Sequence, residues 1–296
     1  MQAPSDPSEV TTMISERPSL AELIECIHTI PSLPEITTRV GRMANDPATT
    51  VPMITAVIVK DAGMSAKMLR LINSAVHGVR ESVTSLEQAV SMLGFDTIRS
   101  IALSVSVVSL FKQEQAQFNM KAYWLHSAVS AGMCRTIARM NKVCDPEHAF
   151  TFGLLKDIGK LILVENVPEE TRAIITIAKE RSLSFTAAAR EVLKTDDAEI
   201  AAWLCQTWEL DADLTDAIRH QHDLAQAKVP GLTAMSMVVE HLCFLRGMRS
   251  PGSFDASELD PQAWRHLGLD KTAFKAVITA MNEDIAAARE LLQIIG

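Results

Sequence analysis

Two neighbouring segments decide the fold class of this chain: Met64-Ser-Ala-Lys-Met-Leu-Arg-Leu-Ile-Asn-Ser-Ala75 and Val83-Thr-Ser-Leu-Glu-Gln-Ala-Val-Ser-Met-Leu-Gly94. In the first segment the apolar residues recur at intervals of three and four, which is the spacing of one face of an α-helix. Asn73 and Ser74 end that helix, because Asn tolerates the left-handed cap conformation and both side chains satisfy free backbone groups. We interpret this pair as a structural helix end and not as a ligand contact.

The second segment shows how the chain reverses and starts a new helix. Gly78 permits the reversal because it has no side chain. Ser85 and Gln88 have the spacing of a capping box, which predicts a helix start. Gly94 is expected to end this helix, and Asp96 is expected to cap the next one.

Helix signals continue along the rest of the chain, with hardly an alternating β pattern between them. Ser19 with Glu22 and Ser32 with Glu35 repeat the capping-box spacing ahead of apolar runs. Further helices are predicted at residues 51–59, 62–73, 96–111, 123–140, from 146 onward, 169–181, 184–193, 198–207, 211–220, 232–245, and from 260 and 270 onward. The sequence therefore predicts an all-α protein.

The composition is typical of a globular protein and argues against nucleic acid as a partner. Of the 296 residues, 48% are hydrophobic and 22% are charged, and the formal net charge is −8. Nucleic-acid-binding proteins normally carry a basic surplus or a basic block, and this sequence has neither. A folded surface could still gather Lys67, Arg70, Arg80 and Arg99 into a local patch. We nevertheless expect no nucleic-acid partner.

The cysteines and the charge-free stretches indicate in which cellular compartment the protein is expected. The five cysteines are scattered without a C-x-x-C motif, which favours reduced core thiols over zinc ribbons. The first twelve residues hold no Lys or Arg, unlike a secretory signal. The longest charge-free stretch, 47–59, has 13 residues, whereas a membrane span needs about 18. We expect a soluble, cytoplasmic protein with no membrane partner.

Four submotifs in order resemble the HDOD family of bacterial signal-transduction proteins. They are Ile30-Pro-Ser-Leu-Pro-Glu35, Asn45-Asp46-Pro47 and the two segments quoted above. The resemblance covers about residues 20–245 and implies a two-lobed, multi-helix fold with an HD-like second half. Active HD domains hold divalent metals on His and Asp residues and hydrolyse phosphate esters, because the metal polarises the phosphoryl oxygen and activates water.

The resemblance also implies that the ligand set of the HD-like half is degraded. Its vestigial positions, in chain order, are His126, Lys156, Asp157, Asp197 and either His220 or His222. Lys156 stands where the histidine of the family's His-Asp pair belongs. Asp197 replaces the next histidine, a milder change because a carboxylate also binds metals.

Lys156 is the departure with the larger energetic effect. At ~4 Å and an effective dielectric of about 20, two unit charges interact by roughly 4 kcal/mol, and a dication doubles the repulsion. We therefore expect no catalytic residue and no metal; any divalent ion that did bind would lie near His126 and Asp157. An ammonium could instead replace the metal among the carboxylates of Asp157 and Asp197, or Lys156 could point to solvent.

Two functions remain in competition. The first is a non-catalytic HDOD regulatory module that binds a protein partner or a small signal. The alternative is a metal-dependent phosphohydrolase of the HD superfamily acting on a nucleotide. The cyclic-dinucleotide branch carries Gly-Tyr-Pro after its histidines, and no such element follows His222. A helical transcription factor would need a basic recognition helix, which the sequence lacks.

Changes in composition predict the domain organisation. A polar stretch at 112–120 is interpreted as the seam between two lobes. The predicted parts are a flexible tail at 1–18, an N-terminal helical lobe at 19–117, an HD-like helical lobe at 118–248, and C-terminal helices at 259–296 that pack on the second lobe.

Overall fold

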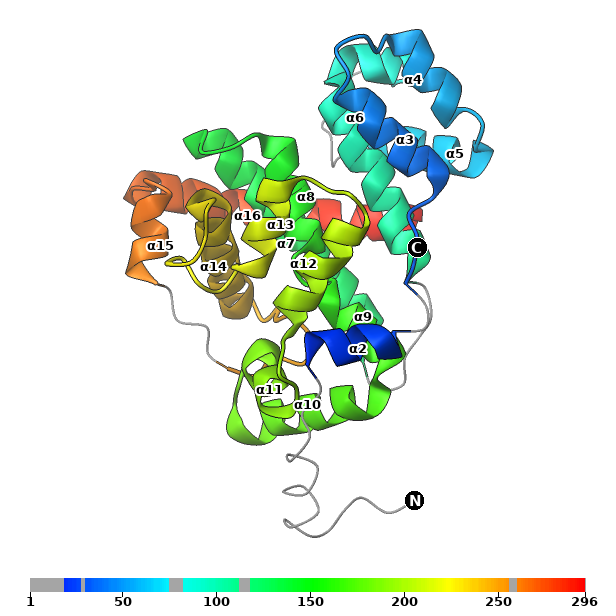
Figure 1. Cartoon of the computed structure of the whole chain (residues 1–296). Coiled ribbons are helices and arrows are strands. Elements are labelled where there is room, and N and C mark those ends of the chain that lie inside the picture. The colour runs from blue at the N-terminus through cyan, green and yellow to red at the C-terminus, as the bar shows by residue number, and fades with distance from the viewer. Residues whose placement is uncertain (1–18, 28–29, 75–81, 112–117, 256–259, 296) are drawn as a thin grey trace.

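The computed structural model describes the chain except for residues 1–18, 28–29, 75–81, 112–117, 256–259 and 296. Every helix or strand assigned in the described part is an α-helix, which confirms the all-α prediction (Figure 1). The helices are α2 (Leu20–Cys26), α3 (Glu35–Ala44), α4 (Val51–Ile58), α5 (Ala62–Ile72), α6 (Leu86–Leu110), α7 (Met120–Asn141), α8 (Pro146–Leu155), α9 (Gly159–Asn166), α10 (Pro168–Arg181), α11 (Phe185–Val192), α12 (Asp197–Thr207), α13 (Ala212–Arg219), α14 (Pro230–Leu245), α15 (Pro261–His266) and α16 (Lys271–Ile295). The predicted tail, Gly78 and most of the polar seam lie outside the described residues.

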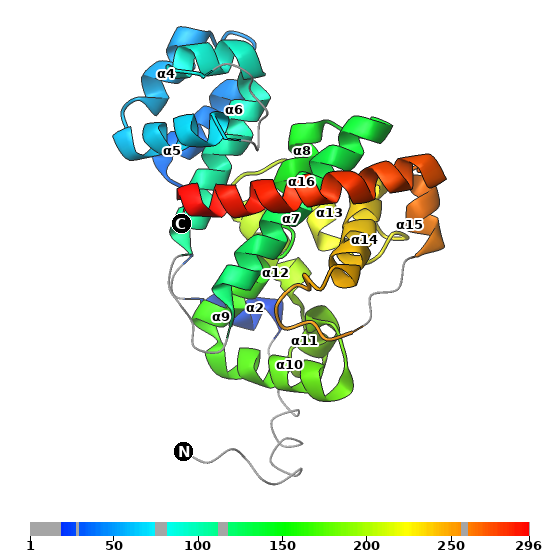
Figure 2. The same ribbon diagram turned by 180° about the vertical axis from the view of Figure 1, so that it is seen from behind.

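The helices form two lobes that are joined by α6 (Figures 1 and 2). Helices α3, α4 and α5 pack against α6 in the first lobe, while α7 to α14 make up the second lobe. Helix α6 also packs against α8, and α16 lies along α7 and reaches α5 and α6. The predicted boundary assigns α2 to the first lobe, but in space α2 lies by α11 and α12, where Leu20 lines a surface pocket with Arg190 and Thr195.

The residues that were predicted to end α5 and start α6 make hydrogen bonds between the two helices and at the start of α6. The Asn73 side chain donates to the carbonyl of Val83 and accepts from its backbone N–H, which closes the loop. Ser85 caps α6 by accepting from the backbone N–H of Gln88. Gly94 has a φ of 79° and breaks the helical geometry within α6, a conformation that glycine adopts without a steric penalty. These bonds are internal to the loop, as the structural interpretation requires.

The two predicted capping boxes near the N-terminus have different outcomes. Ser19 and Glu22 form both reciprocal hydrogen bonds at the start of α2. The prediction for Ser32 and Glu35 is wrong, because α3 begins directly after Pro34 and has no side-chain cap. Pro34 is the N-cap, with an extended ψ of 139°, and a proline disfavours helical geometry in the residue before it. Ser32 is therefore too far from the first turn to cap it.

One helix in the described part, α6, is long and apolar enough to cross a membrane. Of its most apolar stretch, 56% is buried inside the structure, where it contacts α3, α4, α5 and α8. The central core helix of a globular protein passes the same length and composition test. Burial in the core thus explains the apolar character of α6, and the helix is weak evidence for a membrane span.

Candidate functional site

Close packing at two glycines brings the vestigial positions together. A Cβ on Gly153 of α8 would lie 2.6 Å from the carbonyl oxygen of Ser130 on α7, and a Cβ on Gly159 would lie 1.9 Å from that of Asp197. Only glycine permits these approaches. They hold the segment from Gly153 to Gly159 between α7 and α12, where α8 ends and α9 begins. The sequence patterns did not separate α9 from α8.

Lys156 lies fully buried at the C-cap of α8. Its Nζ donates to Asp157 Oδ2 at 2.5 Å and to Glu240 Oε1, which comes from α14. A buried ammonium is tolerated only when carboxylates compensate its lost hydration, and Lys156 has two of them. The solvent-facing alternative for Lys156 does not occur in this structure.

Lys160 places a second buried ammonium in the same cluster. Its Nζ donates to Asp157 Oδ1 at 2.6 Å and to Ser250 Oγ at 2.5 Å. It also lies 3.7 Å from Asp197 Oδ2. Both oxygens of Asp157 are thereby bonded to lysines. We call Lys156, Lys160, Asp157 and Glu240 the ammonium cluster.

His126 of α7 adds a further positive group beside the cluster. Its Nδ1 lies 2.9 Å from the Met248 carbonyl, and its Nε2 lies 2.9 Å from Glu240 Oε1 and 3.3 Å from Asp157 Oδ2. All three partners are acceptors, so both ring nitrogens serve as donors when the ring is protonated. Burial would lower the pKa of His126, but Glu240 and Asp157 outweigh it and hold that pKa well above the ordinary value.

Burial and neighbouring charges also oppose one another in setting the pKa values of Lys156 and its two carboxylate partners. Burial would lower the pKa of Lys156, but the charges of Asp157 and Glu240 raise it instead. Burial would raise the pKa values of both carboxyls, yet Lys156 and the other nearby cations hold them below their usual range. The charged forms therefore stabilise one another, and the cluster is satisfied internally.

Asp197 has a different environment. It is fully buried at the start of α12, and neither carboxylate oxygen has a hydrogen-bond partner among the described residues. Burial raises the pKa of its carboxyl, against the opposing effect of Lys160 at 3.7 Å. Asp197 thus lies next to the cluster without sharing its short bonds.

Neither candidate histidine near residue 220 enters the cluster. His220 lies 3.3 Å from Asp216 in its own helix turn, and exposed His222 lies 3.3 Å from Thr186. The charge of His222 acts to lower the pKa of the Asp197 carboxyl, against the larger effect of burial. The residue between them, Gln221, is fully buried and donates to the Lys156 carbonyl at 2.6 Å.

Sequence reasoning missed Glu240, Lys160 and Gln221. Two of them left a signal: Glu240 is the single carboxylate in the apolar helix α14, and Lys160 precedes the apolar run Leu-Ile-Leu-Val. A charged residue in an apolar helix is rarely buried without a partner. Such residues therefore point to an internal ion pair, although the sequence does not name the partner.

The donor set of a metal site is present but is already engaged. Ligand atoms of His126, Asp157 and Glu240 lie within 4.8 Å of one another, a suitable grouping for a divalent ion. However, Lys156 Nζ contacts both carboxylates, and Lys160 Nζ contacts the other oxygen of Asp157. A dication among these atoms would face two ammonium groups at short range. In this arrangement the residues do not fit a resident metal.

The chain matches the sequence pattern of the HDOD domain over residues 30–224. It belongs to the HDOD domain family. The crystal structure of an HDOD domain protein of unknown function from Geobacter sulfurreducens has a TM-score of 0.81, with 22% identity over 97% of this chain and 99% of that one. An uncharacterized protein of Treponema pallidum (strain Nichols) is 25% identical over 210 residues. The aligned region covers 70% of this HDOD chain but 40% of the length of that relative.

Two further solved structures share the HDOD fold. A proposed signal transduction protein from Marinobacter aquaeolei VT8 has a TM-score of 0.72 and 20% identity, covering 97% of this chain and 65% of that one. A proposed phosphohydrolase from Shewanella amazonensis SB2B has a TM-score of 0.69 and 24% identity, covering 92% and 98%. At these identities the likeness shows the fold alone.

Proposed function

We propose that this HDOD protein is a non-catalytic regulatory module that acts by binding a partner or a small signal. One observation carries the proposal: Lys156 Nζ is bonded to Asp157 and Glu240, the carboxylates that would otherwise hold a metal. The net charge of −8 favours a protein or small-molecule partner over nucleic acid. The name of the Marinobacter structure agrees with a role in signalling.

The chemistry of phosphate ester hydrolysis supports this proposal. An HD enzyme needs a divalent ion to neutralise the phosphoryl oxygens and to lower the pKa of the attacking water. A buried ammonium supplies positive charge, but it has no open coordination position and cannot activate water in this way. Lys156 is also fully buried, so a substrate phosphate would have to displace it from two carboxylates.

The alternative is a metal-dependent phosphohydrolase acting on a nucleotide. The grouping of His126, Asp157 and Glu240 favours it, as does the proposed activity of the Shewanella structure. For this function Lys156 would have to leave both carboxylates when the ion binds. The two functions therefore differ in whether added metal enters the ammonium cluster.

Incubation of the purified protein with a phosphate ester tests the proposal. The probes are p-nitrophenyl phosphate, bis(p-nitrophenyl) phosphate and a nucleoside triphosphate, each with Mn²⁺ or Mg²⁺. We expect no turnover above the rate of the Asp157→Ala variant, and no saturable heat when Mn²⁺ is titrated into the protein. Turnover that scales with protein concentration and disappears in Asp157→Ala would overturn the proposal.

A further inference from the structure

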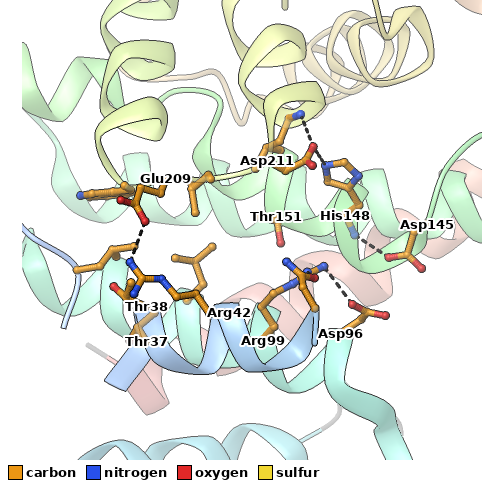
Figure 3. A pocket seen from close by; sticks show the side chains of 17 residues that line it. Thr37, Thr38, Arg42, Asp96, Arg99, Asp145, His148, Thr151, Glu209 and Asp211 are labelled. Carbon is orange, nitrogen blue, oxygen red and sulfur yellow. Dashed lines mark hydrogen bonds and ion pairs between the residues drawn. The ribbon is translucent and has the colours of Figure 1, made fainter. Parts of the chain in front are cut away.

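A cleft of about 490 Å³ lies between the two lobes (Figure 3). One wall comes from α3 and α6 of the first lobe. The other comes from α8 and the connection between α12 and α13. The volume lies within the range of small-molecule sites. Leu33 and Leu210, both half-buried, add apolar surface between the polar groups.

The cleft and the ammonium cluster involve opposite ends of one helix. Helix α8 contributes Asp145, His148 and Thr151 to the cleft, at and near its N-terminus. Lys156, in the cluster, is its C-cap. The cleft is thus a separate site from the degraded metal site.

The two walls of the cleft differ in charge, although Asp96 places one carboxylate beside Arg99 on the first-lobe wall (Figure 3). Arg42 and Arg99 lie on the first-lobe wall, whereas Asp145, Glu209 and Asp211 lie on the second-lobe wall (Figure 3). Among the described residues, one ion pair crosses the cleft, from Arg42 to Glu209 at 2.9 Å. Its side chains are 72% and 71% exposed, so water and ligands can compete for it.

Arg99 has donors to spare. It donates to Asn45 Oδ1 at 2.6 Å and lies 3.1 Å from Asp96 Oδ1, and both partners are on its own wall. A guanidinium carries five N–H donors in a planar fork, which suits a carboxylate or phosphate. Arg99 can therefore bind an anionic group without losing its present partners.

On the opposite wall, Asp145 and Asp211 each use one carboxylate oxygen to cap a helix. Asp145 Oδ1 caps α8, and Asp211 Oδ1 caps α13 and lies 3.5 Å from His148 Nε2. In the described part of the chain, no hydrogen bond involves Oδ2 of either residue. Because the helix N-termini are already capped by carboxylates, this wall favours a cationic group over an anion.

The second-lobe wall is fixed in place before any ligand binds. Trp208 Nε1 donates to the Pro31 carbonyl at 2.8 Å, which ties the connection after α12 to the segment before α3. Glu209 follows with a φ of 55°, a left-handed conformation that is costly for a residue with a side chain. Strain of this kind persists where the surrounding structure holds it, and it is common at ligand sites.

We propose that this cleft binds a small zwitterion, with its carboxylate on Arg99 and its ammonium on the carboxylates of the opposite wall, those of Asp145 and Asp211. The leucines of the cleft would contact an aliphatic side chain, so a free amino acid has the required chemistry. Such a ligand would bind to both walls at once. The inference rests on the regulatory function proposed above, for which it supplies the class of small signal.

Isothermal titration calorimetry of the full chain with the standard amino acids tests the proposal. We expect saturable binding of at least one aliphatic amino acid. Its methyl ester lacks the anion and its N-acetyl derivative lacks the cation, so each should bind about tenfold more weakly or worse, the equivalent of one lost charge-assisted contact. These two derivatives separate a zwitterion site from a plain amine or anion site.

Matched variants assign the contacts. Arg99→Gln should weaken the amino acid about tenfold but leave the ester unchanged. Asp145→Asn with Asp211→Asn should weaken the amino acid but leave the N-acetyl derivative unchanged, and Asn preserves both helix caps. Arg70→Gln, on the exposed face of α5, and Asp61→Asn, at the N-cap of α5, are controls outside the cleft.

Two results would overturn the proposal: no standard amino acid gives saturable heat, or the N-acetyl derivative binds as tightly as the parent. Neither result depends on hydrolysis. Turnover of a phosphate ester would overturn the proposed function and leave the cleft titration standing, whereas absent binding with absent turnover would overturn the cleft alone.

Discussion

The ammonium cluster and the interlobe cleft use the same kinds of side chain under opposite conditions. In the cluster, Lys156 and Lys160 are 0% and 3% exposed, and each lies on carboxylates at short range. In the cleft, Arg42 and Glu209 pair while remaining more than two-thirds exposed. Buried charges must be paired within the protein, because an unpaired one costs several kcal/mol. Exposed charges can change partners at little cost.

The comparison teaches where binding can occur. A set of charges that is already satisfied and buried stabilises one conformation, but it offers little to a ligand. A set with spare donors and acceptors at a solvent-filled cleft can exchange water for a ligand. The buried cluster is therefore poorly suited to reversible binding, and the cleft between the lobes is the better candidate.

Lys156→Met should have the largest effect on stability. Removing the ammonium leaves buried Asp157 beside half-buried Glu240 with one cation fewer. We expect the free energy of unfolding, measured with urea, to fall by about 3 to 5 kcal/mol. Lys228→Met is the matched control, because that lysine is 83% exposed and its ion pair with Asp216 is long, at 3.8 Å. The free energy of unfolding of this variant should stay within about 0.5 kcal/mol of the parent value.

A double variant sharpens this prediction. Lys156→Met combined with Glu240→Gln removes a positive and a negative charge together, so its loss of stability should be smaller than the sum of the two single losses. Simple additivity would mean that the two residues do not interact, contrary to the contact between them.

Asp284→Asn should have an intermediate, pH-dependent effect on the packing of α16. Burial against α7 raises the pKa of Asp284 to about 6, despite a hydrogen bond from Thr136 and the nearby charges of Arg135 and Arg139. The unfolded pKa is about 3.9. The carboxyl therefore stabilises the fold most at acid pH, and this contribution is lost as pH rises through about 6.

The Asp284→Asn variant keeps an acceptor for Thr136 but never ionises. We expect it to be more stable than the parent by about 1 kcal/mol at pH 8, with the advantage shrinking toward pH 5. Urea unfolding at both pH values measures this difference. Glu180→Gln, at an exposed position on α10, should show no such trend. An equal change at both pH values would contradict the assignment.

Glu209→Gly and Glu209→Ala should give the smallest effects. Both variants lose the exposed ion pair with Arg42, which is worth about 0 to 1 kcal/mol. Only glycine relieves the left-handed backbone at this position. The Gly variant should therefore be more stable than the Ala variant by about 1 kcal/mol in thermal or urea unfolding. Equal stabilities would show that Glu209 is not strained.

Local signals in the sequence determined the helices and their ends. The bonds of Asn73, Ser85 and the Ser19 capping box join residues at most ten positions apart, so residue type and spacing suffice to predict them. The exception, Ser32, shows the limit of spacing alone, since Pro34 moved the start of α3. The resemblance to the HDOD family also predicted that Lys156, beside Asp157, stands in a degraded metal site.

Only the tertiary structure decided what Lys156 contacts. Glu240 is 84 positions away on another helix, and no local pattern predicts which helices pack together. That packing depends on close backbone approaches at Gly153 and Gly159, and on the burial of faces that many arrangements could satisfy. The cleft exists for the same reason: Arg42 and Glu209 are 167 positions apart, and they meet because two lobes fold against each other. Long-range contacts are set by the total packing of the chain, whereas helix ends are set by a few neighbouring residues.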